Sequence, residues 1–405
     1  MSRKIRVMII AHFCDYGEEK SNNRFNYLAN LLSTKGYEVE LVTSSFSHRD
    51  KVQRQKNIDG NRSYKTTLIY EPSYQKNISL KRLFISHRVM AQNLRKYMRQ
   101  CVCPDIVYCA IPSINVAEVA SEYAEEKHIP FVIDVQDLWP EAYRLILKRD
   151  VLYRLVTHGM KKRIDRVYQS ADRIIAVSDT YAQRAKAVNA KCVDAITVYL
   201  GTEKSAFDNA VRHNTTEYTK REQELWIGYC GTLGHSYDLT TVMEAMKILA
   251  DRGMSNIRLL VIGSGPLEET FRQKANELGI SCTFVGKLPY GMMCAQLSQC
   301  DIAVNPIAKG AAQSIINKHA DYAMAGLPVI NTQECEEYRN LLATYDCGIN
   351  CDPESTAQIA DAIDSLANHP ERRAEMHQNA YRMGEEKFDR AKTYGAILKV
   401  IENML

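Results

Sequence analysis

Short runs of β-branched and aliphatic residues alternate with segments of helical periodicity along the whole chain. This order predicts parallel strands joined by crossover helices, and therefore doubly wound α/β domains. In the first half we expect strands at residues 5–11, 39–43, 105–110, 131–135, 173–177 and 195–199. In the second half we expect them at residues 225–229, 257–262, 282–285, 301–305, 329–331 and 348–350.

The length of the chain predicts two domains. A chain of 405 residues exceeds what one ordinary hydrophobic core accommodates. A polar stretch at residues 201–224 separates the two sets of strands. We therefore expect one Rossmann-like domain at residues 1–205, a second at residues 206–385 and a terminal helix at residues 386–405.

The composition is that of a globular protein, with 45% hydrophobic and 25% charged residues. No run of about 18 apolar residues occurs, and the N-terminus leads into a strand without a signal sequence, so we expect a cytoplasmic protein. The twelve cysteines are scattered and form no Cys-x-x-Cys pair. They are expected to be small apolar core residues, with no disulfide or metal role.

The net charge of +4 is unevenly distributed. Residues 1–205 hold 33 Lys and Arg against 22 Asp and Glu, a net charge of +11, which leaves −7 for residues 206–405. Residues 72–104 contain seven basic side chains and no carboxylate, interleaved with apolar residues at partly helical spacing. This pattern predicts a basic amphipathic helix for an anionic membrane surface or a phosphate-bearing acceptor, or a solvated helix that is merely basic. No recognition motif accompanies the charge, so we expect no nucleic-acid partner.

Residues 313–330 predict a helix with a polar start, a glycine stop and a buried strand. Ser314, Asn317, Lys318 and Asp321 share one side and the first turn of this helix, and Gly326 ends it. The helix follows the strand at residues 301–305, so its free N–H groups are expected to meet an anion such as phosphate. The alternative is an ordinary amphipathic helix with a solvated polar face.

Two glycine-rich turns follow predicted strands in the second half. The turn at residues 228–234 contains Gly231, Thr232 and Gly234, and the turn at residues 261–267 contains Gly263 and Gly265. Such turns let backbone N–H groups approach a diphosphate, although either can also be a simple tight turn. A third segment, residues 284–288, ends in Lys287 and Leu288.

Together these segments resemble the nucleotide-binding half of the family 4 retaining glycosyltransferases. The resemblance implies an α/β GT-B fold, with two doubly wound Rossmann-like domains facing a central cleft and a C-terminal helix that returns to the first domain. It implies a nucleoside-diphosphate sugar as donor, a UDP-sugar being favoured, with no metal and no further cofactor.

The resemblance also implies roles for individual residues. The segment of Lys287 and Leu288 is expected to hold the nucleobase, and Asp321 the ribose. The family usually has glutamates at the positions of Gln313 and Asp321, with Gln313 near the donor sugar. The family often has an Arg and a Lys in the first glycine turn as well, and this chain has neither, so Lys318 is expected to neutralise the phosphates.

In the first half, residues 134–141 resemble an acceptor-side motif of the same family. Asp137 is the candidate acid or base, the alternative being a carboxylate that caps the following turn. Arg24 is expected to reach a phosphate across the cleft. The form Gln-Asp-Leu-Trp-Pro-Glu is similar to that of the branch that builds capsular or O-antigen polysaccharide. It implies a lipid-diphosphate-linked saccharide acceptor and a peripheral location at the inner face of the cell membrane, contacted through residues 72–104.

Two other functions remain open from the sequence. A GT-B sugar-nucleotide epimerase or hydrolase would share the nucleotide half. A catalytically weakened nucleotide-binding partner subunit would account for Gln313, Asp321 and the missing cations of the first glycine turn. A NAD-linked dehydrogenase is disfavoured, because no Gly-x-Gly-x-x-Gly follows the first strand.

Overall fold

The computed structural model describes residues 3–16, 24–54, 62–76, 79, 81–145, 147, 149–192, 194–311 and 314–405. The chain divides into two compact units: unit 1 is Met1–Val198 with Tyr394–Leu405, and unit 2 is Tyr199–Thr393. The sequence placed the corresponding limits after residues 205 and 385. The last helix of the chain therefore belongs to unit 1.

Unit 1 contains a seven-stranded sheet in the order β3-β2-β1-β4-β5-β6-β7, with every neighbouring pair parallel. Its strands are β1 (Arg6–Ile10), β2 (Glu38–Ser44), β3 (Lys65–Ile69), β4 (Ile106–Ile111), β5 (Phe131–Val135), β6 (Arg173–Ala176) and β7 (Ala195–Thr197). Its helices are α1 (Arg24–Thr34), α2 (His87–Gln100), α3 (Ile114–Lys127), α4 (Asp150–Ser170), α5 (Asp179–Lys186) and α15 (Gly395–Glu402). Two short helical segments are η1 (Lys81–Ser86) and η2 (Glu141–Leu145).

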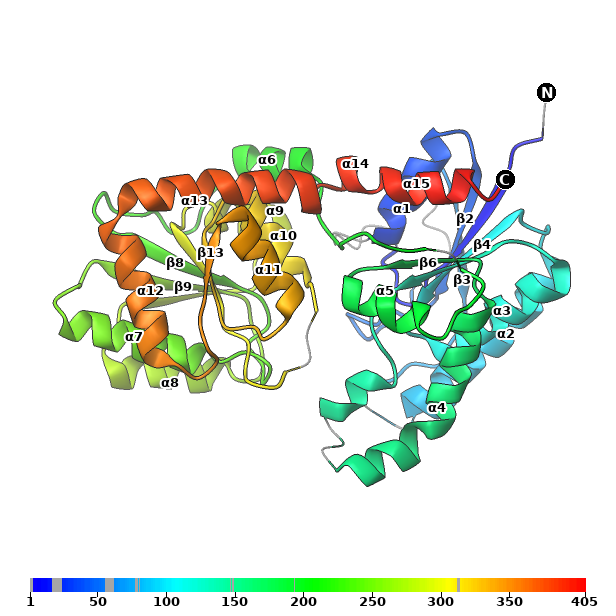
Figure 1. Ribbon diagram of the computed structural model, residues 1–405, viewed down its shortest axis with the longest axis horizontal. Helices are drawn as coiled ribbons and strands as arrows, with labels where there is room; N and C mark the ends of the chain where they lie inside the picture. The colour runs from blue at the N-terminus through cyan, green and yellow to red at the C-terminus, as the bar shows by residue number, and fades with distance from the viewer. Residues whose placement is uncertain are drawn as a thin grey trace. The chain divides into compact units, whose positions relative to one another are not determined.

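Side chains of the central strands alternate between the two faces of this sheet. Met8 and Ile10 of β1 join one core with residues of α2, α3 and α4, whereas Val7 and Ile9 join a second core with residues of α1 and α15. Figure 1 shows the same layers, with α1 and α15 on one side of the sheet and α2, α3 and α4 on the other. A sheet covered on both faces explains why every residue of β4 is buried.

Unit 2 contains a six-stranded parallel sheet in the order β10-β9-β8-β11-β12-β13. Its strands are β8 (Leu225–Cys230), β9 (Ile257–Ile262), β10 (Cys282–Gly286), β11 (Ile302–Asn305), β12 (Val329–Asn331) and β13 (Gly348–Asn350). Its helices are α6 (Lys204–His213), α7 (Leu239–Asp251), α8 (Glu268–Leu278), α9 (Tyr290–Leu297), α10 (Asn317–Met324), α11 (Glu336–Tyr345), α12 (Thr356–Asn368), α13 (Pro370–Met383), the segment η3 (Gly384–Phe388) and α14 (Arg390–Thr393). Residues of α7, α8 and α12 pack on one face, and residues of α6, α9, α10, α11 and α13 on the other.

The prediction of two parallel, doubly wound sheets is confirmed, and each of the twelve expected strands is present. The prediction missed β3, the edge strand of unit 1. Its sequence is Lys-Thr-Thr-Leu-Ile, and only Ile69 is buried, so the strand lacks the apolar run that marked its neighbours.

The basic segment at residues 72–104 forms η1 and α2. The apolar side of α2, which includes Met90, Leu94 and Met98, packs into the core of unit 1. Arg88, Lys96 and Arg99 are exposed on the opposite side of this helix. The amphipathic pattern is therefore satisfied within unit 1, and what α2 presents to solvent is charge.

Two absences concern only the residues that the structure describes. None of their helices is long and apolar enough to cross a membrane. No group of three or more His, Cys, Asp or Glu among them is placed to hold a metal ion.

Candidate functional site

A pocket of about 540 Å³ lies in unit 2 at the carboxyl ends of β8 and β9 and the start of α10. Eight of the residues singled out in the sequence line it: Gly231, Thr232, Gly263, Lys287, Leu288, Asn317, Lys318 and Asp321. The carboxyl edge of a parallel sheet is where open α/β folds bind ligands. The structure thus brings together four segments that are scattered over residues 228–321.

The two glycine turns of the pocket pack backbone against backbone. Gly231 N donates to the carbonyl of Ile262 at 2.9 Å, and Leu233 N donates to that of Ser264 at 3.1 Å. A Cβ on Gly263 would lie 1.8 Å from the carbonyl oxygen of Gly231, and one on Gly265 would lie 2.3 Å from that of Leu233. The contact therefore requires glycine at both positions, and Gly263 also has a φ of 144°.

Lys318, the second residue of α10, is 7% exposed. Its Nζ has no hydrogen-bond partner among the described residues. The ammonium lies 3.9 Å from the ring centroid of Tyr237 and 4.3 Å from that of Tyr229. Burial lowers the pKa of Lys318 to about 7. The amine is buried between two aromatic rings on the wall of a pocket and lacks a hydrogen-bond acceptor within the described ranges, so an anion in the pocket would stabilise its charged form.

Asp321 lies three residues further along α10, where it is 9% exposed and lines the same pocket. The hydroxyl of Tyr290 donates to its Oδ1 at 2.9 Å. Burial raises the pKa of Asp321 to about 6, although the hydrogen bond from Tyr290 and the charge of Arg390 lower it. The carboxylate retains acceptor capacity for a ligand hydroxyl.

The segment before α10 is only partly described. Gln313 lies outside the described residues. Ser314 is buried and its Oγ has no partner in the described part of the chain, while its carbonyl accepts from Gln333 Nε2 at 2.9 Å. Asn317, the first residue of α10, is exposed.

Amide side chains connect this segment to the strand ends of unit 2. Asn305 Nδ2 donates to Asn331 Oδ1 at 2.8 Å and to Gln333 Oε1 at 3.1 Å. Asn331 Nδ2 donates in turn to Asn350 Oδ1 at 2.8 Å. This amide ladder (Asn305, Asn331, Gln333, Asn350) fixes the backbone at Ser314, three residues before α10.

The first-half candidates lie in unit 1. Asp137 follows β5 by two residues, and its carboxylate accepts from its own turn: from Leu138 N at 2.9 Å and from Trp139 Nε1 at 3.0 Å. Burial raises its pKa. Arg24 is 3% exposed, with its Nε donating to Asp134 Oδ2 at 2.7 Å and its Nη1 to the carbonyl of Val198 at 2.7 Å. These contacts hold Arg24 within unit 1 through its Nε and Nη1.

A buried polar cluster occupies the carboxyl edge of the unit 1 sheet. His12 lies 2.6 Å from Ser113 Oγ through Nδ1 and 3.0 Å from Glu71 Oε2 through Nε2. Glu71 also accepts from Ser44 at 2.7 Å and from Ser86 at 2.8 Å. Burial raises the pKa of Glu71, but the contacts from His12 and the two serines outweigh it and hold the pKa at about 2.

Two family models match the chain. Glycosyltransferase Family 4 matches residues 21–200, and Glycosyl transferases group 1 matches residues 212–383. The two matches together take in most of both units. The chain belongs to the group 1 glycosyltransferases. No curated protein sequence is significantly similar to it.

Solved structures share the fold of this glycosyltransferase at low sequence identity. Sucrose-phosphate synthase from Thermosynechococcus elongatus is 15% identical, with a TM-score of 0.74 and 99% coverage of both chains. Anabaena HepE in complex with UDP-glucose is 12% identical, with a TM-score of 0.67, covering 98% of this chain and 100% of that one. The lipopolysaccharide outer core galactosyltransferase WaaB is 15% identical, with a TM-score of 0.64, covering 99% and 100%. The predicted two-domain GT-B fold is thus confirmed.

The sequence did not single out Tyr237, which lines the pocket, or Tyr229 and Tyr290, which contact Lys318 and Asp321. Tyr290 follows Leu288 by two residues and begins α9, so an aromatic residue at the start of the next helix was the available signal. Tyr229 and Tyr237 approach Lys318 only through the fold, because their positions along the chain show no pattern that links them to α10. The same is true of His12 and Glu71, which are 59 residues apart.

Proposed function

We propose that the chain transfers a sugar, with retention of configuration, from a nucleoside-diphosphate sugar to a lipid-linked saccharide acceptor in surface polysaccharide synthesis. The observation that carries the proposal is the unpartnered, buried Nζ of Lys318 in a pocket walled by two glycine turns. A diphosphate is a ligand that would supply the missing counter-charge at this ammonium.

The geometry of the pocket supports a nucleotide donor. Gly231 and Gly263 let the backbone approach the diphosphate, Lys318 neutralises it, Asp321 accepts from the ribose hydroxyls, and Lys287 and Leu288 flank the base. The electrostatic stabilisation by the Lys318 ammonium increases as negative charge develops on the leaving diphosphate. Lys318 would supply the positive charge that the first glycine turn lacks, because this turn contains neither Arg nor Lys. A pocket that keeps such a cation favours an active enzyme over a weakened binding subunit.

The reaction needs no dedicated protein base at the donor carbon. The acceptor oxygen bonds to the anomeric carbon as the bond to the diphosphate breaks, and the leaving phosphate takes the proton of the acceptor hydroxyl on the same face. The protein holds the two substrates in register and stabilises the departing charge. We further propose that the reaction uses no metal, that Gln313 contacts the donor sugar, and that Asp137 contacts the acceptor.

The substrate classes are supported by the similar structures. HepE has been solved with UDP and with UDP-glucose, and WaaB is a lipopolysaccharide outer core galactosyltransferase. We therefore favour a UDP-sugar donor and an acceptor of the capsular or O-antigen kind on a lipid diphosphate. The enzyme would then act at the inner face of the cell membrane.

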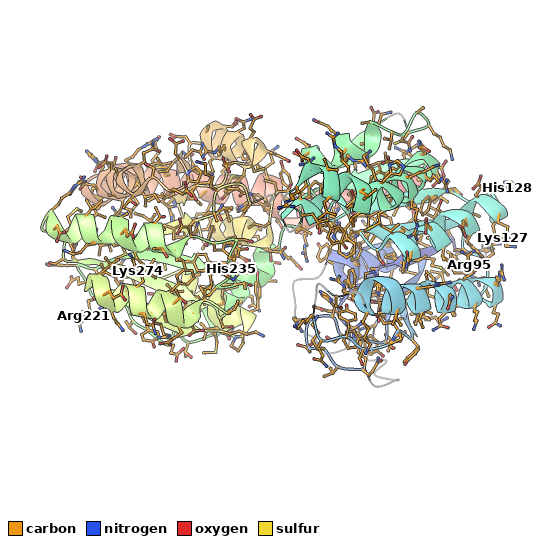
Figure 2. The ribbon with its side chains drawn as sticks, turned by 90° about the horizontal axis from the view of Figure 1, so that it is seen from below. Arg95, Lys127, His128, Arg221, His235 and Lys274 are labelled. Carbon is orange, nitrogen blue, oxygen red and sulfur yellow. The ribbon has the colours of Figure 1, made fainter. Side chains whose placement is uncertain are left out.

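The test is calorimetric binding of UDP, GDP and ADP, followed by product analysis with the sugar nucleotides of the tightest base. A Lys318→Met variant should lose most of the affinity. The matched control is Lys274→Met, which removes a lysine of α8 (Figure 2). This lysine pairs with Glu244 at 2.8 Å and does not line the pocket. If no nucleotide binds, or if both variants bind equally well, the proposal fails.

A further inference from the structure

A second pocket, of about 460 Å³, lies in unit 1 among α2, α3, α4 and Trp139. Its apolar walls are Ala91, Ile114, Val119, Trp139 and Met160. The three helices cover one face of the sheet (Figure 1). Trp139 is the one lining residue that belongs to the motif at residues 134–141, and none of the candidate catalytic residues lines the pocket.

One wall of this pocket carries a buried polar atom without a partner. His87, the first residue of α2, lines the pocket and is 3% exposed. Its Nε2 has no hydrogen-bond partner among the described residues. Its ring stacks on Trp139, with centroids 5.9 Å apart. A buried ring nitrogen left unpaired costs free energy, and a polar ligand group in the pocket would remove that cost.

The pocket is also cationic. Arg88, Arg95 and Arg163 line it together with a single carboxylate, Glu118. Arg163 is occupied by Glu118, to which its Nε donates at 2.7 Å. Arg95, which Figure 2 labels, pairs with Glu122 of α3 at 2.5 Å. Arg88 is exposed and makes no ion pair among the described residues, so it is the side chain available to an anionic group.

An apolar stripe runs from the pocket along α4. Leu152 and Val156 precede Met160 by two turns and one turn, and all three share a face with Arg163. Leu152 is 45% exposed and Val156 is 54% exposed, and the neighbouring Val151 and Leu155 are 82% and 78% exposed. From Leu152 to Arg163 the stripe is about 16 Å long. Exposed Arg154, Lys161 and Lys162 border it.

We propose that the pocket and the stripe bind one amphiphilic molecule, a prenyl or acyl phosphate or diphosphate. Its anionic head group lies at Arg88 and His87, and its hydrocarbon chain follows Met160, Val156 and Leu152. The unpaired cation in the pocket complements the anionic head group of such a ligand, and the exposed aliphatic stripe complements its hydrocarbon chain. The inference rests on the proposed function, because it places the lipid part of the acceptor. The head group lies at the start of α2 and the hydrocarbon chain along α4.

Trp139 provides a direct signal of occupancy, because it lines this pocket and the chain has only one other tryptophan, Trp226, buried in unit 2. The probe is farnesyl diphosphate, titrated below its micellar concentration into the full-length Trp226→Phe protein. Inorganic diphosphate and farnesol are the controls. We expect saturable quenching with farnesyl diphosphate at concentrations where neither control responds. Calorimetry on the unsubstituted chain checks the same affinity without the substitution.

Three variants distinguish binding at this site from nonspecific electrostatic attraction and from nonspecific hydrophobic adsorption. Arg88→Glu should weaken farnesyl diphosphate binding about tenfold, because it reverses the charge at the head group. The double variant Leu152→Ser, Val156→Ser should weaken it several-fold without loss of folding, since both side chains are exposed. Arg99→Glu makes the same charge change on the same helix away from the pocket, and should leave binding unchanged.

Three results would overturn the proposal. They are equal binding of inorganic and farnesyl diphosphate, equal effects of Arg88→Glu and Arg99→Glu, and attachment to phosphatidylglycerol vesicles without any response to farnesyl diphosphate. UDP binding is measured on the same samples, so that failure of the lipid site can be distinguished from failure of the proposed function. Normal UDP binding with no lipid binding refutes the lipid site alone, whereas lipid binding without nucleotide binding refutes the transferase.

Discussion

Replacing Lys318 by Met should stabilise the fold and weaken nucleotide binding at the same time. The methionine keeps the length and the apolar stem of the side chain and removes the ammonium. The pKa of Lys318 is lowered from 10.5 to about 7, so burial disfavours its charged form by about 5 kcal/mol. Contacts of the ammonium with the rings of Tyr229 and Tyr237 return part of that cost, about 1–2 kcal/mol each.

The sign of the stability change follows from the direction of the pKa shift. Below pH 7 the ammonium of Lys318 is charged in the folded and the unfolded states, and the folded protein bears the whole cost of burying it. Between pH 7 and 10.5 the folded state releases the proton first, so the cost decreases as the pH rises. At pH 6 we therefore expect Lys318→Met to be more stable by about 1–3 kcal/mol, a rise in Tm of roughly 3–8 °C.

Binding should change in the opposite direction. The variant loses a charge-assisted contact to the diphosphate, about 1.5–3 kcal/mol, or about 10- to 150-fold in the Kd for UDP. Thermal denaturation and calorimetry at pH 6, with Lys274→Met as control, measure both effects. A variant that is less stable than wild type and binds UDP equally well would refute the account of Lys318 as a buried, unpaired cation that serves a ligand.

Three further predictions concern the same pocket. The affinity of the wild type for UDP should fall as the pH rises above about 7, by at most tenfold per pH unit, because free Lys318 loses its proton there; Lys318→Met should lack this dependence in calorimetry from pH 7 to 9. Asp321→Asn should weaken UDP binding about tenfold and 2′-deoxy-UDP binding much less, and equal losses would remove Asp321 from the ribose. Gly263→Ala should cost about 3 kcal/mol or more in urea unfolding, because its Cβ would overlap the carbonyl of Gly231. Gly253→Ala, with φ of 91° and open space around it, should cost only about 1–2 kcal/mol, and similar losses in both would contradict the packing argument.

The strands were predictable because most of them are buried on both faces. β4 and β8 are continuous apolar runs whose every residue is buried, and such runs are legible without any knowledge of the partner strands. β3 differs because it lies at the edge and buries only Ile69, so its identity as a strand depends on pairing with β2. Sequence reasoning failed where tertiary pairing, rather than burial, defines the element.

The basic segment shows the limit of pattern arguments in another way. The pattern of α2 correctly indicates an amphipathic helix, but it does not say what covers the apolar face. In the structure Met90 and Leu94 pack inside unit 1. Single aliphatic residues of the basic segment, Ile85 and Val102, are exposed outside α2, but the start of α4 gathers four of them, with Val151 and Leu155 the most exposed. Exposure depends on how the helix packs in the fold, and the sequence pattern does not distinguish a buried apolar face from an exposed one.

In the candidate site too, local features were predictable from the sequence and features that depend on tertiary packing were not. Glycine turns and a polar helix start are local features, so Gly231, Gly263 and Lys318 were found from the sequence. The amide ladder behind them was not, although Asn305, Asn331 and Asn350 each end a strand. In a parallel sheet with β11, β12 and β13 in register, residues at equivalent strand ends lie side by side, and Asn305 pairs with Asn331, which pairs with Asn350. The register that aligns three separate strand ends is set by the packing of the whole unit. The backbone before α10 is therefore held by contacts that no single segment encodes.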